Sequence, residues 1–558
     1  MVGSRASPAS SIHIARNLNQ DDNDDDGEED SRRSYDGEHE KNKKGKYLEN
    51  NEVDVSDNGA NNAIDDDHLF VPDGLDLFTN DADTSWEPGW LTPPLSISPD
   101  QSISPSRDLN AQVIPMLITP AALPESLHEL GMSYFLTNYV VQNSGPCPGF
   151  LNYTLDIFAD PLGDPELVQV AIRAVGLAGL ASTTGADNIM YKARASYAEA
   201  IERVNAALED SRTTRNDSTL FAVMVLGLFE TITCSSDKSL EAWKYHINGA
   251  ANLLMHRGTA QFGTRLGLQL FGEAVSHVLT LCSRYGQPVP PRLRLLRVEL
   301  ERNFVRKGPP WILSTAHIEV MDLYNRVDPD QKTPFLPGEW EKLLSHAAEL
   351  DQRLENLVAE LPAHWRFMTV SDPSANQHIV YNNVYHVYYN TWVAKVWNGL
   401  RACRIILNQV IYCLLLREGL AWAPYELSPE GGVYTALLQR ILETTTEMRD
   451  GILASVPQML GFVRHDAAMG TSYLDCGRAG MPYFVPASGA YFLLWYLFLA
   501  GSLPINSPET RAWVVDRLRA IRSAAGIQKA GYFADILETN PAFIITEISM
   551  NEFLVPSI

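Results

Sequence analysis

Residues 164–178 read DPELVQVAIRAVGLA and carry a clear helix signal. Asp164 is a residue type that caps helix N-termini, and Pro165 is favoured at the first helical position. Apolar residues then recur at offsets of 0, 3, 4, 7, 8 and 11, at Leu167, Val170, Ala171, Ala174, Val175 and Ala178. Because an α-helix has about 3.6 residues per turn, these positions form one apolar stripe. The stretch predicts a helix that packs one face into a core.

The same pattern continues along the chain and predicts an all-α body over residues 111–558. Tyr197, Ile201, Val204 and Leu208 repeat the stripe. Asp217 and Ser239 are placed to cap two further helices, of which Gly258 ends the second. Later helices are expected at 340–361, 380–416, 435–453, 488–503 and 509–524. No segment of comparable length alternates with a period of two, and no repeat of fixed period is present.

Residues 1–110 differ sharply from this body in charge. They hold 9 of the 44 Lys+Arg and 25 of the 68 Asp+Glu, a net charge of −16, which leaves −8 for the other 448 residues. A segment this acidic and this rich in Asn and Ser buries too little apolar surface to offset its conformational entropy. We therefore expect a disordered acidic arm.

Within the arm, residues 65–91 combine eight acids, and no Lys or Arg, with exposed aromatic and leucine residues. Acids keep such side chains soluble and able to dock into a partner's groove, which is the pattern of a disordered activation segment. The alternative is a short segment that folds back on the body. Arg32-Arg33 and Lys41-Asn42-Lys43-Lys44-Gly45-Lys46 match a nuclear import signal or, equally, a solvated charge run.

Residues 479–508 lack any charged residue and include the apolar run 491–499. Pro486, Gly489 and Pro504 shorten the expected helix to roughly fifteen residues, fewer than the ~20 that span a bilayer. We therefore expect a buried core helix and no membrane span. The N-terminus carries no apolar secretion signal.

No catalytic, cofactor-binding or metal-binding set is recognisable, so we expect no enzyme activity, no cofactor and no metal. The motifs HExxH, GxSxG, GxxxxGK and GxGxxG are absent. The six cysteines are dispersed without a CxxC pair, which predicts buried thiols in a reducing compartment and no zinc site. They are Cys147, Cys234, Cys282, Cys403, Cys413 and Cys476.

Two segments have both a structural and a functional interpretation. The aromatic run at Tyr381, Tyr385, His386, Tyr388, Tyr389, Trp392 and Trp397 is interpreted as core, with a small-molecule cavity as the alternative. The basic cluster 284–307 is interpreted as a solvated face, with phosphate binding as the alternative.

Several strings, in a fixed order, together suggest a family. The first group is Asp217-Ser218-Thr219-Leu220, Leu226-Gly227-Leu228-Phe229-Glu230, Ser239-Leu240-Glu241-Ala242-Trp243, His246-Ile247-Asn248-Gly249-Ala250 and Arg257-Gly258. The second is Trp397-Asn398-Gly399-Leu400-Arg401, Arg404-Ile405, Ala454-Ser455-Val456-Pro457, Leu494-Trp495, Ala500-Gly501, Arg511-Ala512-Trp513 and Gly526-Ile527. Over residues 160–535 this set resembles the regulatory region of fungal Zn(II)2Cys6 transcription factors.

That resemblance implies a large multi-helix regulatory domain, a nuclear protein and control of RNA polymerase II transcription. The family's zinc cluster needs six closely spaced cysteines, but the first cysteine here is Cys147, so no DNA-contact residue can be carried over. We expect partners among transcriptional coactivators or other regulators, or a homo- or hetero-dimer. The alternative is a protein that binds no DNA itself and partners an intact zinc-cluster factor. A zinc-cluster exon upstream of Met1 would distinguish the two.

Overall fold

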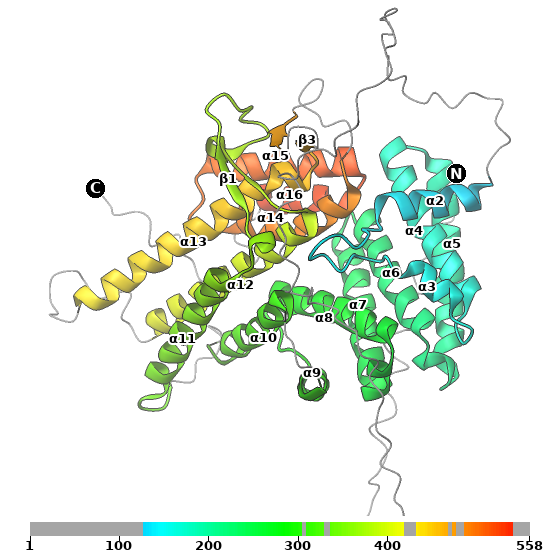
Figure 1. Cartoon of the computed structure of the whole chain (residues 1–558), viewed down its shortest axis with the longest axis horizontal. Coiled ribbons are helices and arrows are strands. Elements are labelled where there is room, and N and C mark those ends of the chain that lie inside the picture. The colour runs from blue at the N-terminus through cyan, green and yellow to red at the C-terminus, as the bar shows by residue number, and fades with distance from the viewer. Residues whose placement is uncertain are drawn as a thin grey trace, which may run out of the picture.

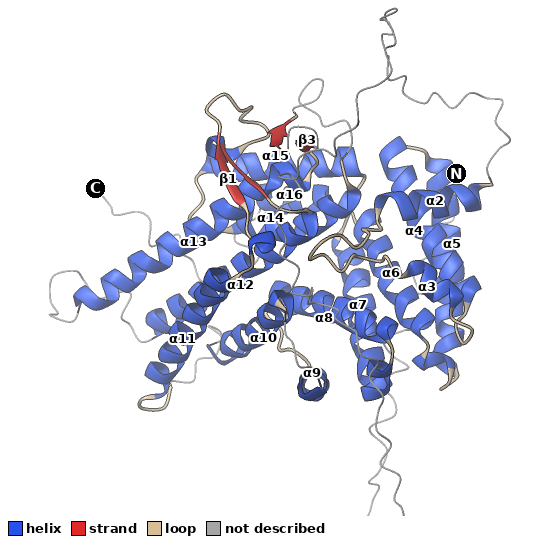
Figure 2. Cartoon of the chain, in the orientation of Figure 1, coloured by secondary structure: helices blue, strands red, loops and turns tan. Residues whose placement is uncertain are grey.

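The structure is a computed structural model that describes residues 126–303, 308–327, 335–417, 431–466, 471–475 and 485–539. In these ranges helices dominate and the strands are few and short (Figures 1 and 2), which confirms the all-α prediction. The buried apolar side chains form one core cluster from Phe135 to Leu537. Residues 1–125, with the predicted arm, its segment 65–91 and its basic cluster, lie outside the described residues.

The helices fall into an earlier and a later set along the chain. The earlier set is α2 (Leu127–Asn138), α3 (Thr154–Ala159), α4 (Pro165–Thr184), α5 (Asp187–Glu209), α6 (Asp217–Thr233), α7 (Asp237–Arg257) and α8 (Arg265–Tyr285). The later set is α9 (Pro291–Asn303), α10 (Pro309–Val327), α11 (Glu339–Glu360), α12 (Thr391–Arg417), α13 (Gly431–Met459), α14 (Ala487–Ser502), α15 (Pro508–Ala525) and α16 (Gln528–Thr539). In Figure 1, α2 to α6 gather on one side of the molecule and α11 to α13 on the other.

Helix α4 begins as its sequence predicts. The side chain of Asp164 accepts a hydrogen bond from the backbone N–H of Leu167 at 3.0 Å, and Pro165 is the first helical residue. Helix α4 packs against α2, α5 and α6, so it is buried on more than the predicted stripe. Arg173 is buried within it, and its guanidinium donates to Ser196 and Glu199 of α5. These two hydrogen bonds replace the hydrogen bonds to water that the guanidinium loses on burial.

The glycines of α4 allow close helix packing. A methyl group on Gly176 would lie 1.7 Å from the carbonyl oxygen of Gly131 in α2. A methyl group on Gly179 would lie 2.4 Å from the hydroxyl oxygen of Tyr139. No side chain fits at either distance, so the contact between α2 and α4 depends on glycine.

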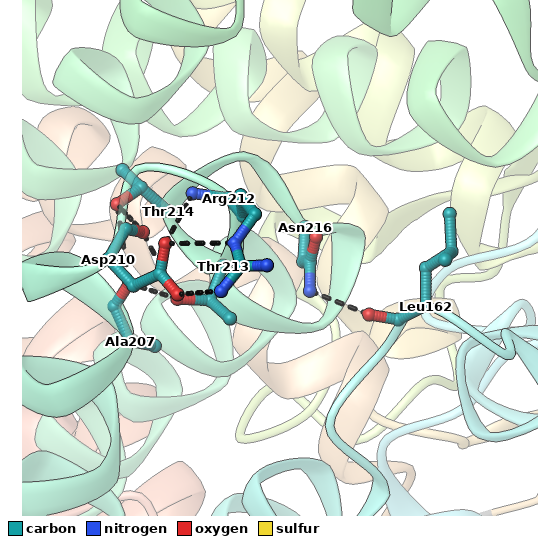
Figure 3. A network of polar contacts seen from close by, with 7 residues as sticks. All are labelled: Leu162, Ala207, Asp210, Arg212, Thr213, Thr214 and Asn216. Atoms are coloured by element: carbon teal, nitrogen blue, oxygen red, sulfur yellow. Dashed lines mark hydrogen bonds and ion pairs between the residues drawn. The ribbon is translucent and has the colours of Figure 1, made fainter.

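A polar turn joins α5 to α6 (Figure 3). The hydroxyl of Thr213 donates to the carbonyl oxygen of Ala207 at 2.7 Å, and that of Thr214 donates to the carbonyl oxygen of Asp210 at 2.8 Å. Carbonyls at a helix C-terminus lack partners within the helix, so these hydroxyls supply them. The side-chain amide of Asn216 donates to the carbonyl oxygen of Leu162 at 2.7 Å, which ties the turn to the loop before α4.

The predicted helix 380–416 is wrong over its first eleven residues. Residues 384–387 form strand β2 (Val384–Val387), which pairs antiparallel with β1 (Met368–Ser371), and α12 begins only at Thr391. Asn382 and Asn383 have positive φ values of 49° and 61°, which an α-helix cannot contain but which Asn tolerates. A second hairpin pairs β3 (Val463–Asp466) with β4 (Thr471–Leu474). The other predicted helices match α11, α14 and α15 to within one residue at each end, and α13 extends beyond its predicted limits.

The apolar run 491–499 lies in α14, which is 16 residues long and buried along most of its length. The predicted core helix is therefore confirmed. Among the described helices, α4 alone has the length and apolar composition of a membrane span, and most of that helix is buried inside the protein.

Candidate functional site

Buried polar contacts hold together the α6–α7 region, in which the first group of family-like strings lies. Asp217 at the start of α6 forms an ion pair with Arg257 at the end of α7. The hydroxyl of Tyr197 donates to Glu230 at 2.5 Å and lies 2.9 Å from Nε2 of His246. Burial raises the pKa of Glu230 and lowers the pKa of His246 to about 4. The ion pair and these hydrogen bonds therefore connect α5, α6 and α7.

The second group of strings also marks contacts between elements. The amide of Asn398 in α12 donates to the hydroxyl of Ser455 in α13 at 2.8 Å. The indole N–H of Trp397 donates to the carbonyl oxygen of Trp365 at 2.7 Å. The indole N–H of Trp513 donates to the carbonyl oxygen of Gln377 at 2.8 Å. These strings therefore join distant parts of the body.

A cavity of about 170 Å³ lies between α8, α10, α12, α14 and the segment 148–153. Glu273 of α8 and Lys395 of α12 both line it. One carboxylate oxygen of Glu273 accepts a hydrogen bond from the hydroxyl of Tyr153 at 2.8 Å, and the other is shielded from solvent without a partner. Burial raises the pKa of Glu273 to about 7. The cavity therefore offers a carboxyl group that can accept or release a proton near neutral pH.

Lys395 is held among aromatic rings. Its ammonium lies 4.8 Å from the ring centre of Phe492 and 5.7 Å from that of Phe150. Burial lowers the pKa of Lys395, and the charge of Glu273 raises it. No ion pair joins Lys395 to Glu273 among those of the described residues, although both side chains line the cavity.

The wall formed by α10 is also polar. Arg297 reaches it from α9, lies 4.0 Å from the ring centre of Trp311 and donates to Ser314 at 2.9 Å. His317 lies 2.5 Å from the hydroxyl oxygen of Ser283, and burial lowers its pKa to about 4. An uncharged His317 beside a cationic Arg297 gives this wall hydrogen-bonding groups and one positive charge.

A larger cavity of about 500 Å³ lies between α11, α12, α13 and the β1–β2 hairpin. Arg401 lines it and donates to the hydroxyl of Tyr388 at 2.7 Å and to the side-chain oxygen of Asn398 at 2.8 Å. His386 lies 3.3 Å from the same guanidinium, which together with burial lowers the pKa of His386 to about 3.

The aromatic run 381–397 is divided between core and cavity. Tyr385, Tyr388, Trp392 and Trp397 are buried in the core cluster. Trp392 also lines the smaller cavity, and Tyr381, His386 and Trp397 line the larger one. The interpretation as core is therefore confirmed for the four buried side chains, other members of the run line a cavity, and most of the run is not helical.

The basic cluster 284–307 does not form a continuous charged face. Arg284 and Arg297 are each 6% exposed and enter the interior. Arg294 forms an ion pair with Asp322, and Arg302 forms one with Glu299. Residues 304–307 lie outside the described residues. The described arginines are mostly neutralised or buried.

Five of the six cysteines are buried, as predicted, and form no disulfide among the described residues, while Cys476 lies outside them. Burial raises the pKa of the Cys147 and Cys282 thiols to about 11. Within the described ranges, no group of three or more His, Cys, Asp or Glu side chains is placed to hold a metal ion.

The sequence did not single out Glu273, Lys395 or Lys529. Each is a lone charged residue in a short apolar run, FGEAV, WVAKVW and IQKAGYF respectively. That pattern could have identified them from the sequence. A single charged side chain among apolar residues must be buried, paired or directed to a cavity.

Comparison with known proteins identifies one family. Residues 130–280 match the model of the fungal-specific transcription factor domain. No curated protein and no solved structure matches. The matched range runs from α2 into α8 and contains the first group of strings. The match confirms the resemblance drawn from those strings and places it in residues 130–280, which are similar to the fungal-specific transcription factor domain.

Proposed function

We propose that this chain regulates RNA polymerase II transcription in the nucleus of a fungus, through protein contacts of its helical body and acidic arm. The observation that carries the proposal is the match of residues 130–280 to the fungal-specific transcription factor domain. That family consists of transcription factors and not of enzymes, in keeping with a mechanism based on binding.

Tethering the full chain to a promoter tests this proposal. The chain is fused to an unrelated DNA-binding domain, and RNA polymerase II occupancy of a reporter gene is measured by chromatin immunoprecipitation. Occupancy should rise or fall at least several-fold relative to the DNA-binding domain alone. Unchanged occupancy, with the fusion present at the promoter, would contradict the proposal.

The candidate second function is that of a partner for an intact zinc-cluster factor. The observation that favours it is the absence of any cysteine before Cys147, which removes the ligands of a zinc cluster from the sequence in hand. Purified chain should then bind no promoter DNA by itself and should be recovered with a zinc-cluster protein by affinity capture. Specific DNA binding by the chain alone would exclude this function.

Residues 65–91 supply the proposed contact with coactivators. Their aromatic and leucine side chains would dock into an apolar groove, while the acids would steer the encounter. Fused to an unrelated DNA-binding domain, the segment should activate a reporter gene, and changing Phe70, Phe78, Trp86 and Trp90 together to Ala should abolish that output. A matched variant with four acids changed to their amides should keep part of it. A silent fusion, or a fully active four-Ala variant, would contradict the assignment.

A further inference from the structure

A second, smaller cavity of about 70 Å³ is lined by α6, α7, α8, α12, α14 and α16. Three of its lining residues carry a cationic group: Arg284 of α8, Lys395 of α12 and Lys529 of α16. No Asp or Glu is among the residues that line it. The described wall of this cavity is therefore positively charged without a compensating carboxylate.

Arg284 is buried among aromatic rings. Its side chain is 6% exposed, and none of its three guanidinium nitrogens has a hydrogen-bond partner among the described residues. The ring centres of Phe533 and Phe498 lie 4.8 Å and 5.1 Å from it. The hydroxyl of Tyr285 influences the pKa of Arg284 but does not make a hydrogen bond of good geometry with it. Aromatic faces attract the charge but leave the N–H donors unused.

Lys529 faces the same cavity and is 4% exposed. Its ammonium lies 3.7 Å from the ring centre of Trp243. Burial, together with the positive charge of Arg284, lowers the pKa of Lys529 to about 7. Two cations in a buried space repel each other, so the arrangement is unfavourable unless a negative charge is brought in.

The nearest acids do not supply that charge. Glu230 lies close enough to raise the pKa of Lys529, but its carboxylate accepts the hydroxyl of Tyr197, and burial favours its neutral form. Glu273 accepts the hydroxyl of Tyr153 in the adjoining cavity. Neither acid forms an ion pair with Arg284 or Lys529 among those of the described residues.

We propose that this cavity binds a small oxyanion, the carboxylate or phosphate group of a metabolite, between Arg284, Lys395 and Lys529. A buried arginine with free donors is suited to the oxygens of either group. The 170 Å³ cavity shares Ser276, Thr280, Lys395 and Tyr496 with this one as lining residues. It gives the remainder of such a metabolite a place beside Trp311 and Trp392. The bound anion would join α8, α12 and α16, so binding would stabilise the body as a whole.

Thermal unfolding of the purified full chain tests the proposal with two probes, inorganic phosphate and succinate, against sodium chloride at equal ionic strength. At least one probe should raise the melting temperature in a saturable manner beyond chloride. A response to phosphate alone identifies a phosphate group, and a response to succinate alone identifies a carboxylate. If neither probe differs from chloride, the proposal is overturned, whatever the variants do.

Three site variants and one control variant locate the effect. Arg284→Met and Lys529→Met should each weaken the response at least tenfold in probe concentration, and without any probe they should unfold at the same temperature as the native chain or higher. Lys395→Met, at a less buried position, is a further site variant should either of those fail to fold. Lys238→Met, which removes an exposed lysine of α7, is the matched control and should keep the full response. Site variants that respond as strongly as Lys238→Met would show binding at the surface and would overturn the proposal.

Discussion

At the scale of single residues, the interior of this protein contains an unusual set of ionisable side chains whose charges are controlled by burial. His246 is 2% exposed and has a pKa lowered to about 4, whereas Glu273 has a pKa raised to about 7. Asp217 and Arg257 are buried as an ion pair. These groups make the stability of the body depend on pH and on individual partners.

His246 gives a pH dependence whose sign follows from its lowered pKa. Between about pH 6.5 and pH 4 the unfolded chain binds a proton at His246 and the folded chain does not, so this group reduces stability as pH falls. From pH 7 to pH 5 its contribution to the free energy of unfolding should decrease by about 2 kcal/mol. Urea unfolding of the native chain and of His246→Gln at both pH values isolates the contribution. Glu273 and Glu230 act in the opposite direction but are present in both proteins. Equal pH dependence in the two proteins would contradict the prediction.

The ion pair between Asp217 and Arg257 should be worth far more than an exposed pair. Their side chains are 14% and 5% exposed, and two guanidinium nitrogens of Arg257 have no other partner among the described residues. Asp217→Asn should therefore lower the free energy of unfolding by about 3 kcal/mol, because an unpaired buried charge remains. Glu538→Gln removes one of the two acidic partners of the exposed Arg519 and should change the free energy of unfolding by less than about 1 kcal/mol. Similar losses for the two variants in denaturant titrations would contradict this account.

At the scale of elements, capping and periodicity located helices but did not fix every cap. The N-caps of α6 and α7 are Asn216 and Ser236, and not the predicted Asp217 and Ser239. Asp164 and Pro165 fixed the start of α4, and the apolar stripe that follows identified its buried face. The helix prediction for residues 380–390 was wrong because Tyr385 and His386 belong to a strand that pairs with β1 and are buried there. Periodicity along the sequence cannot reveal such a contact with a separate segment. The cavities were not predictable for the same reason: Glu273, Lys395 and Lys529 come together only through packing of α8, α12 and α16.

The crossing of α2 and α4 provides a prediction at this scale. Gly176→Ala would place a methyl group 1.7 Å from the carbonyl oxygen of Gly131, so the helices must separate. We expect the free energy of unfolding to fall by about 3 kcal/mol, at the upper end of overpacking effects. Gly263→Ala is the matched control, because its methyl group meets no atom within 4 Å and its φ is not positive. The two variants should differ clearly in urea midpoint, and equal midpoints would show that α2 and α4 do not pack this closely.

At the scale of the whole molecule, a helical body with one continuous core presents buried charges to internal cavities. Residues 130–280 of that body match the model of the fungal-specific transcription factor domain. Most of the negative charge of the chain lies instead in residues 1–110. The sequence was sufficient for the fold class and the family, since both depend on patterns along the chain. It was not sufficient for the cavities, which depend on how side chains meet in space.

The central claim is that this protein regulates transcription by RNA polymerase II. Its most direct test is rapid depletion of the tagged protein in its own fungus, followed within minutes by genome-wide measurement of RNA polymerase II occupancy. The account predicts changed occupancy at a defined set of genes whose promoters crosslink to the protein before depletion. Unchanged occupancy at every gene after complete depletion would contradict it.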